Sequence, residues 1–488
     1  MIVSVDIGTS SVKVSLISLE GNVVRWASHP VETMSPELGA AEHDLEALYQ
    51  ALLKGVKSVV EGYESRVEAI TFSCYLHGVA ILDRERKPLT RVITHLDTRA
   101  GKYQSTVESY GNELYRRTGC PPIFVYPLVK LPWLREKLRL NEKYYLTFVK
   151  DYLIYRLTGL TILDYGTASG TGLMNVHSLK WDDLALNVAG VDESMLPQLT
   201  EGASVVEYVS IPELGLRNVA LVPGSFDGAL QNIGYSVYGE EAALNLGSTA
   251  VIRTLSKEVV IDRDLRMRFF CYYAADGYRA IGAASNNGMS SLEWIRGNLL
   301  GDVNWSTVEE EVSKIKPCSD EVIVLPFIGG ERFPYRNPYL RLTIVGPSVS
   351  HSRAHIARAS FEGVAFILKA ILDALEENGV TIKTLHCGGG GCAIGSLVKM
   401  VADTCCKPVV TYREDVARLT SSIGAAAVAI RALKYSTSID NVKFEFVSKS
   451  KLGAVEPEES ACVTYRGCYE KFSKVLSIVS NIYGDVVG

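Results

Sequence analysis

Residues 6–12 read DIGTSSV, and residues 245–251 read NLGSTAV. Each stretch carries an acid or amide at the end of an apolar run, then a glycine with hydroxyl residues, then a second apolar run. One copy begins each half of a chain of 488 residues, which is too long for a single hydrophobic core. The repeated hairpin therefore predicts two large domains of similar build. Chance similarity between two hairpins is the alternative.

Strand-like and helix-like patterns alternate along the rest of the chain, which is typical of an α/β protein. We place the boundary between the domains near residue 238, giving domains at 1–238 and 239–488. The expected strands are 2–6, 12–18, 69–74, 242–246, 251–255 and 321–326, and the expected long helices are 43–61, 352–378 and 395–405.

The overall composition is that of an ordinary globular protein, with 47% hydrophobic and 22% charged residues. A net charge of -5 gives no electrostatic reason to expect nucleic acid or a membrane surface as a partner. The first residues, MIVSVD, do not resemble a signal peptide, and no stretch approaches the roughly 20 apolar residues of a membrane span. We therefore expect a cytoplasmic protein. Its ten cysteines include no Cys-x-x-Cys pair, so we expect reduced thiols buried as small apolar side chains.

The two hairpin turns are suited to holding phosphate groups. Successive backbone N–H groups in a tight turn form a concavity for an anion, and glycine lets the chain approach closely. Two such turns on opposite sides of a cleft would hold a polyphosphate between them. The candidate phosphate-binding residues are Thr9, Ser10, Ser11 and Lys13 in the first hairpin and Gly247, Ser248 and Thr249 in the second.

Two further features lie near these turns. Asp6, at the end of the first strand, is a candidate ligand for Mg²⁺, which takes few carboxylates and keeps several waters. The alternative is that Asp6 only caps the turn. Four successive glycines at 388–391 follow a short apolar strand and remove side chains where a flat ligand or a phosphate must touch the backbone.

Together these stretches resemble the FGGY carbohydrate kinase family over nearly the whole chain. The two hairpins match its two phosphate motifs, and residues 388–391 match its adenosine motif. Other matching segments follow in order: His77-Gly78, Asp97-x-Arg99, Arg117-Thr118-Gly119, residues 130–134, Leu157-Thr158-Gly159, Gly330-Glu331-Arg332-x-Pro334, and residues 358–363.

The resemblance implies two actin-like (ribonuclease-H-like) domains flanking a catalytic cleft, with ATP and Mg²⁺ as cofactors. It implies that Asp227 binds the substrate and is the general base that accepts the proton of its hydroxyl. His77 and Gly78 are then the substrate-binding residues, and Gly288, Gly389 and Gly390 are further nucleotide-binding residues.

The substrate that the resemblance implies is a small sugar or sugar acid. Residues 227–234 (DGALQNIG), 164–169, 172–175, 270–272 and 286–288 most resemble the gluconate kinase branch. The His77-Gly78 pair is instead the form of the pentulose kinases, so xylulose, another pentulose or a polyol is the alternative. Glu331 and Arg332 could be substrate-binding or catalytic residues, but for this pair we favour a structural ion pair at the cleft.

A different class of function also stays open. The same ATPase core serves non-catalytic roles, so an actin-like ATPase or a sugar sensor is a remote alternative, against which Asp227 argues. The sequence does not set the oligomeric state, a homodimer included.

Overall fold

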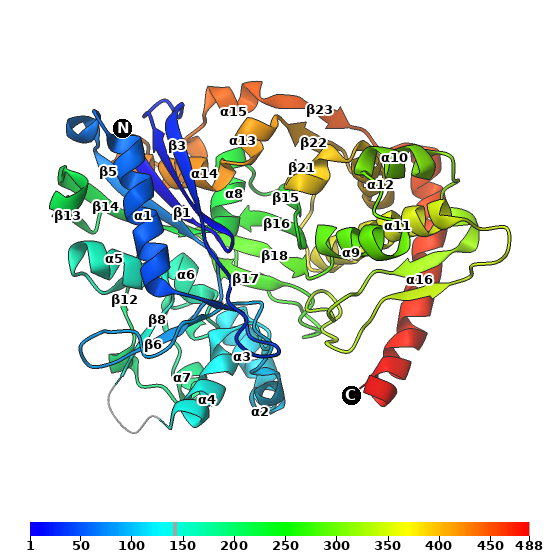
Figure 1. Cartoon of the computed structure of the whole chain (residues 1–488), viewed down its shortest axis with the longest axis horizontal. Coiled ribbons are helices and arrows are strands. Elements are labelled where there is room, and N and C mark those ends of the chain that lie inside the picture. The colour runs from blue at the N-terminus through cyan, green and yellow to red at the C-terminus, as the bar shows by residue number, and fades with distance from the viewer. Residues whose placement is uncertain (140–143, 488) are drawn as a thin grey trace.

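The computed structural model describes residues 1–139 and 144–487 and consists of two large mixed β-sheets, each covered by helices (Figure 1). The first sheet has the order β13-β14-β5-β1-β2-β3 and the second has the order β17-β18-β16-β15-β21-β22-β23. The strands of the first are β13 (Glu207–Ile211), β14 (Leu216–Phe226), β5 (Ala69–Cys74), β1 (Ile2–Ile7), β2 (Ser11–Ile17) and β3 (Val23–Pro30). Those of the second are β17 (Phe270–Tyr273), β18 (Arg279–Ser285), β16 (Ala250–Ser256), β15 (Glu241–Leu246), β21 (Thr384–Gly388), β22 (Val409–Tyr412) and β23 (Lys451–Val455).

The repeated hairpin of the sequence has the same place in both sheets. In the first sheet, β1 pairs antiparallel with β2 and parallel with β5. In the second, β15 pairs antiparallel with β16 and parallel with β21. The two halves of the chain therefore share a topology, and the fold is α/β with two actin-like domains, as expected.

The long elements expected from periodicity are confirmed to within a few residues. They form α1 (Leu45–Val60), α11 (Arg353–Glu377) and α12 (Gly395–Cys405), while the strand expected at 321–326 is the shorter β19 (Ile323–Leu325). Helix α1 begins after Asp44, whose carboxylate accepts hydrogen bonds from the backbone N–H groups of Glu46 and Ala47. This cap satisfies donors that have no partner within the helix.

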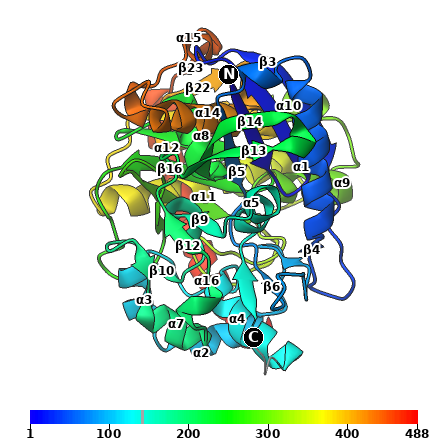
Figure 2. The same ribbon diagram turned by 90° about the vertical axis from the view of Figure 1, so that its left-hand side faces the viewer.

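A group of shorter elements lies between β5 and β13 in the sequence and extends the first domain below its sheet (Figures 1 and 2). Its helices are α2 (Gln104–Glu108), α3 (Gly111–Thr118), α4 (Pro127–Leu138), α5 (Lys150–Thr158), α6 (Tyr165–Ser169) and α7 (Asp183–Ala189). Its short strands among the described residues are β6 (Ala80–Leu82), β7 (Val92–Ile93), β8 (Tyr145–Thr147), β9 (Ile162–Asp164), β10 (Met174–Asn175), β11 (Lys180–Trp181) and β12 (Gln198–Thr200).

Helix α14 (Thr420–Ala432), from the second half of the chain, packs on α8 (Asp227–Tyr235) and on strands β1, β5 and β14 of the first sheet. Two glycines make this packing close. A Cβ on Gly424 would lie 1.9 Å from the carbonyl oxygen of Leu230, and one on Gly234 would lie 2.2 Å from that of Thr420. The two halves are thus held together by a tightly packed helix pair.

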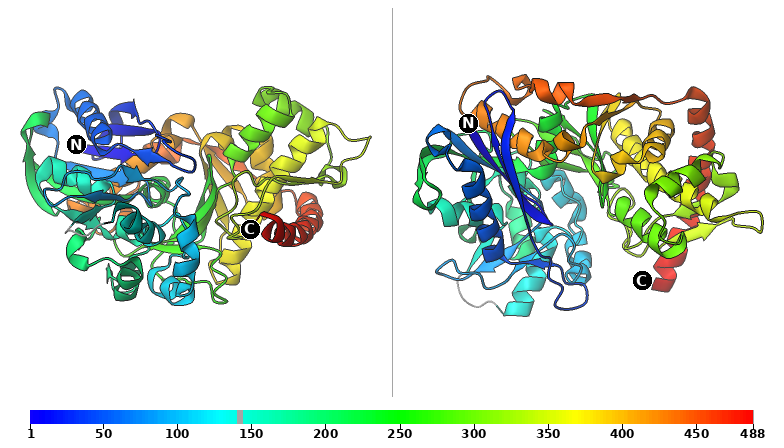
Figure 3. Two further views of the ribbon diagram at one scale, coloured as in Figure 1. Left: turned by 60° about the horizontal axis from the view of Figure 1, so that its bottom comes forward. Right: turned by 45° about the horizontal axis from the view of Figure 1, so that its top comes forward.

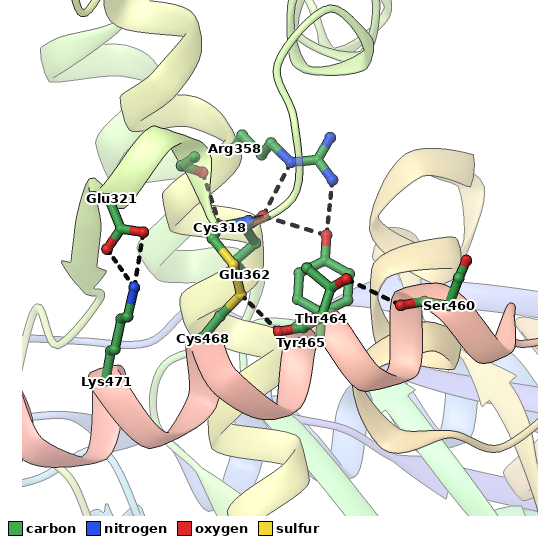
Figure 4. Close-up of a disulfide and its surroundings, with 10 residues drawn as sticks. Cys318, Glu321, Arg358, Glu362, Ser460, Thr464, Tyr465, Cys468 and Lys471 are labelled. Carbon is green, nitrogen blue, oxygen red and sulfur yellow. Dashed lines mark hydrogen bonds and ion pairs between the residues drawn. A yellow bond between two sulfur atoms is a disulfide. The ribbon is translucent and has the colours of Figure 1, made fainter.

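The C-terminal helix α16 (Glu459–Val487) lies along the outside of the second domain, and β23 crosses the molecule toward it (Figures 1 and 3). Cys468 and Cys462 on α16 form disulfides with Cys318 and Cys406. Beside the first disulfide, the Tyr465 hydroxyl lies 2.7 Å from Nη2 of Arg358 (Figure 4).

A third disulfide joins Cys387 to Cys392. The three disulfides involve six cysteines, so the expectation of reduced thiols was wrong for these six. The pairs on α16 join residues 150 and 56 positions apart, a proximity that only the fold creates. The buried free thiols among the described residues are Cys74, Cys120, Cys271 and Cys405.

Among the described residues, no helix combines the length and the apolar character needed to cross a bilayer.

Candidate active site

The two phosphate-type turns are built alike. The N–H of Gly8 donates to the carbonyl oxygen of Ser11 over 2.9 Å, and the N–H of Gly247 donates to that of Thr249 over 3.1 Å. Each bond closes a tight turn between antiparallel strands. The tips are accessible, with Ser10 and Ser248 exposed. Thr9, Ser11, Lys13 and Thr249 are partly exposed beside them.

A pocket of about 450 Å³ lies beside the second turn. The glycine-rich loop and the start of helix α9 (Met289–Leu299) form its other walls. The lining residues are Gly247, Ser248, Met289, Ser290, Glu293, Trp305, Glu309, Gly390, Ala393 and Ile394. This pocket is large enough for a nucleoside and begins at a phosphate-type turn.

The predicted glycines have different parts in this pocket. A Cβ on Gly390 would meet nothing within 4 Å, so this residue is open to a ligand. Gly389 has a φ of +93° and packs against the backbone of Leu246. Gly288 packs on the second turn, and its N–H donates to the Ser248 carbonyl oxygen over 3.2 Å. The structure thus brings all three glycines to the nucleotide-sized pocket, but only Gly390 lines it.

Sequence reasoning missed the pocket residues from α9, from α10 (Trp305–Ser313) and from the end of the glycine-rich loop. Trp305 donates from Nε1 to Glu293 over 3.0 Å, and Glu309 accepts a 2.9 Å bond from the N–H of Ser396. No local pattern marks these residues, because they come together only through packing between elements distant in sequence.

Asp6 is buried at the end of β1, next to the first turn. Its Oδ1 accepts a 2.6 Å hydrogen bond from Ser73 Oγ on β5, and its Oδ2 lies 3.9 Å from Nζ of Lys13. Ser73 therefore fixes one oxygen, while the other faces a cation at the phosphate turn. No hydrogen bond from the turn itself to the Asp6 side chain is present among the described residues, which argues against a simple capping role.

Asp227 is the first residue of α8, immediately after β14. The chain reaches this point through Gly224, whose φ is +71° and whose Cβ, if present, would lie 2.0 Å from the Phe72 carbonyl oxygen. Lys150 fixes the end of the strand by donating to the carbonyl oxygen of Ser225 (2.8 Å) and to Asp164 (2.7 Å). The backbone that carries Asp227 is thus held from two sides.

The pKa of the Asp227 carboxyl is raised to about 6, first because it is buried and second because Asp6 is close. Arg253 on β16 and Lys13 act in the opposite direction. The charges of Asp6, Lys13 and Asp227 therefore act on one another, together with that of Arg253, which sequence reasoning missed.

Gly228 explains how Arg253 reaches this cluster. A Cβ at residue 228 would lie 2.5 Å from Nη1 of Arg253, so a side chain here would displace the guanidinium. Arg253 is held from behind, since its Nε donates to Asn232 over 2.9 Å and its Nη2 to Gln231 over 3.2 Å. The DGALQN segment (residues 227–232) thus leaves room for the Arg253 side chain and holds it by hydrogen bonds.

His77 lies in a group of aromatic rings that extends to Phe226, the residue before Asp227. Its ring centroid is 4.7 Å from that of Tyr126 and 6.1 Å from that of Tyr272, which in turn is 5.8 Å from Phe226. His77 has a φ of +71°, and its Nδ1 lies 2.7 Å from the carbonyl oxygen of Gly170. Burial lowers its pKa, so the imidazole is neutral, with the proton on Nδ1 and a lone pair on Nε2.

Gly78 is buried beside His77, and a Cβ there would touch Val149 and Val92 at 3.0 Å. Only its backbone is available to a substrate.

The expected ion pair between Glu331 and Arg332 was wrong, because no such pair within 4.0 Å occurs in the part of the chain that the structure describes. Instead the Glu331 carboxylate accepts from Ser285 Oγ and, over 3.0 Å each, from Asn286 N and Asn287 Nδ2. Among the described residues, the Arg332 side chain makes one hydrogen bond, from Nε to the carbonyl oxygen of Ala284 over 2.6 Å, and the charge of Glu331 acts on it without a direct ion pair.

Two domains with matching turns, a nucleotide-sized pocket and a partly buried carboxyl group at Asp227 are the features of a phosphotransferase of the sugar kinase type. The model of the FGGY family of carbohydrate kinases, N-terminal domain, matches residues 1–234, and that of the C-terminal domain matches residues 242–433. The chain belongs to this family and is a sugar kinase.

Its relatives include kinases of several substrates. A gluconokinase from Bacillus subtilis (strain 168) is 32% identical over 395 residues, covering 76% of each chain. A xylulose kinase from Staphylococcus xylosus is 23% identical over 97% of this chain and 99% of its own. Among solved structures, gluconate kinase from Lactobacillus acidophilus matches with a TM-score of 0.92 and 25% identity, covering 99% of both chains.

Proposed function

We propose that the chain transfers the γ-phosphoryl group of ATP to a hydroxyl of a sugar acid, with gluconate as the leading substrate. The observation that carries the proposal is the partly buried Asp227 carboxyl, whose pKa responds to the charges of Asp6 and Lys13 and which directly follows Phe226, a ring in contact with Tyr272. The similarity to gluconokinases supports gluconate in particular.

Asp227 is the general base in this proposal. A pKa of about 6 leaves most of its carboxyl ionised near pH 7, so it can accept the proton of the attacking hydroxyl as the new P–O bond forms. His77 Nε2 accepts a hydrogen bond from another substrate hydroxyl. The aromatic rings exclude water, which would otherwise compete as the acceptor.

ATP, when bound, supplies the phosphoryl group. The residues that fit it are the two hydroxyl turns around Thr9 and Ser248, Lys13, and the pocket that continues to Gly390 and Trp305. Lys13 neutralises phosphate charge, and the backbone N–H groups of the turns hold the phosphate oxygens.

Asp6 fits Mg²⁺ bound chiefly through phosphate and water. The described residues contain no group of three His, Cys, Asp or Glu side chains that would hold a metal by themselves. Mg²⁺ in kinase sites usually takes only one or two carboxylates. The Oδ2 of Asp6, 3.9 Å from Lys13, is the oxygen that Ser73 leaves free.

Xylulose or another pentulose or polyol is the second candidate. The His77-Gly78 pair and the similarity to xylulose kinases and glycerol kinases favour it.

We also propose a domain boundary near residue 238, between β14–α8 and β15, and a cytoplasmic location. Three disulfides in a cytoplasmic enzyme require an organism whose interior permits them, as in hyperthermophiles.

The test is ADP release from Mg-ATP with gluconate, xylulose, glycerol or no sugar. We expect the highest kcat/KM with gluconate and slow release without sugar. Asp227→Ala should keep ATP binding and lose about 10²–10⁴-fold in turnover. Asp415→Ala, at an exposed aspartate paired only with Arg413, is the control. If no sugar stimulates ADP release, the chain is a non-catalytic ATPase or a sensor, and if Asp227→Ala keeps a tenth of the rate, Asp227 is not the base.

A further inference from the structure

The disulfide between Cys387 and Cys392 encloses the glycine-rich loop, because only the four glycines at 388–391 separate the two cysteines. Cys387 is the next-to-last residue of β21 and is 1% exposed. Cys392 belongs to a short 3₁₀ helix (Gly390–Ala393) and is partly exposed. The bond therefore ties the far end of the loop back to a strand of the second sheet.

The Cys387 end of this ring is fixed by the sheet. Strand β21 lies between β15 and β22, and Cys387 is paired with Leu244 of β15. The same strand β15 leads into the second phosphate-type turn at Gly247. Cys387 is thus part of the frame that carries this turn.

The Cys392 end of the ring belongs to a wall of the nucleotide-sized pocket. Gly390 lies inside the ring, Ala393 and Ile394 follow it directly, and all three line the pocket. Beyond this wall, Glu309 accepts hydrogen bonds from the N–H and the hydroxyl of Ser396, over 2.9 and 3.1 Å, and so holds the start of α12. The wall therefore runs between two fastenings, of which the disulfide is the covalent one.

The four glycines make this loop costly to order. Glycine loses more backbone freedom on ordering than any other residue, and it has no side chain to anchor it. The backbone bonds of the loop are local, from Cys392 N to the oxygen of Gly389 (3.2 Å) and from Ile394 N to that of Gly391 (3.0 Å). Gly389 and Gly391 also pack on Leu246. These contacts define one position of the loop, and the disulfide restricts the alternatives.

We propose that the Cys387–Cys392 disulfide positions the glycine-rich loop for the nucleotide, so that the protein with this disulfide binds ATP more tightly than the protein with two thiols. A cross-link that keeps the free protein in the binding-competent form removes part of the entropy cost of binding. If the opened loop has this form for about a tenth of the time, the affinity falls about tenfold. This inference rests on the proposed ATP site and adds that its affinity depends on a pair of thiols.

A dithiol reductant opens the ring by thiol–disulfide exchange. A thiolate of the reagent attacks Sγ of Cys392, the more accessible sulfur, and Sγ of Cys387 leaves and takes a proton. The second thiol of the reagent then releases Cys392 as a thiol, and the reagent departs as a cyclic disulfide. Two electrons and two protons have passed to the protein. By linkage, bound nucleotide favours the disulfide by the same factor by which the disulfide favours the nucleotide.

The experiment compares nucleotide affinity with and without this one cross-link. A non-hydrolysable ATP analogue is titrated calorimetrically into wild type and into Cys387→Ala/Cys392→Ala, the loop variant, in non-reducing buffer. We expect binding to the loop variant to be about tenfold weaker, with kcat and the KM for the sugar unchanged at saturating ATP. Dithiothreitol should weaken binding by wild type to the same level and should leave the loop variant unchanged.

The matched control variant is Cys406→Ala/Cys462→Ala, which removes the disulfide at the other end of α12. It should bind the analogue as wild type does. Equal affinities of wild type and the loop variant, or an equal loss in the control variant, would overturn the positioning role, and sugar-stimulated ADP release would still support the kinase function. If wild type binds no analogue, the proposed ATP site itself is wrong.

If the loop variant does not fold, wild type equilibrated with mixtures of reduced and oxidised dithiothreitol decides. Thiol alkylation and mass spectrometry then measure the fraction of disulfide at each pair. Adding the analogue should raise this fraction at residues 387 and 392 and leave it unchanged at residues 406 and 462. No rise at 387 and 392, or an equal rise at both pairs, overturns the inference.

Discussion

At the scale of single residues, the site depends on the balance of charge around Asp227. Burial and Asp6 favour the neutral carboxylic acid, and Arg253 and Lys13 favour the carboxylate that can act as a base. Arg253 is itself buried, which lowers its pKa to about 10, but it stays protonated near neutral pH. Gly228 is the residue that makes room for it.

We predict that Arg253→Gln shifts the acid limb of the pH–rate profile to higher pH. In the proposed role of general base, Asp227 must be ionised to accept a proton, so the rate should fall as pH drops through its pKa. Arg253 lowers that pKa, and its removal raises it by about one pH unit. The measurement is kcat/KM for the sugar from pH 5 to 9, with Arg253→Lys as the control that keeps the charge. If the acid limb of Arg253→Gln stays at the same pH, then Arg253 does not set the pKa of Asp227.

At the scale of elements, the C-terminal helix α16 is fastened by covalent and non-covalent contacts. Tyr465 is buried against Arg358 and Glu362, Phe472 is fully buried, and Lys471 pairs with Glu321 over 2.6 Å. The disulfide from Cys468 closes a loop with a sequence separation of 150 residues (Figure 4). A long closed loop restricts the unfolded chain strongly.

We predict that the Cys318→Ser/Cys468→Ser double variant has a free energy of unfolding lower by about 2–5 kcal/mol in non-reducing buffer. In dithiothreitol it should match reduced wild type, and turnover should change little because α16 lies outside the active site. Denaturant unfolding in both buffers measures this. The prediction is contradicted if dithiothreitol does not change the stability of the wild-type protein and mass spectrometry finds free thiols at Cys318 and Cys468.

At the scale of the whole molecule, the two phosphate-type turns belong to different sheets, and in the proposed function they hold one nucleotide between them. Helix α14 packs on α8 and the first sheet, which ties the halves together near Asp227. Gly234 and Gly424 let α8 and α14 pack so closely that separating the two helices would lose many contacts. We therefore expect this helix pair to stay together and the two domains to move about it. Closure then brings Thr9 and Ser248 onto the same phosphates.

We predict positive cooperativity between sugar and nucleotide. Each ligand favours the closed arrangement, so each should tighten the other by about fivefold or more. Calorimetric titration of gluconate with and without a non-hydrolysable ATP analogue measures the effect. Equal affinities in the two titrations would mean that the turns do not close on a shared ligand.

Much of the fold was predictable from local sequence. The hairpins at 6–12 and 245–251, the strand before each and the long amphipathic helices depend on residues close together in the chain, so periodicity and turn residues determine them. The repeated motif also determined the matching topology of the two sheets.

The tertiary structure alone decided which distant side chains meet. The place of Arg253 depends on an absent side chain at Gly228. The disulfides on α16 and the pocket wall at Trp305 and Glu309 likewise join separate elements. The physical reason is that pairing and burial depend on distances across the fold, whereas local patterns in the sequence report only on the secondary structure around them.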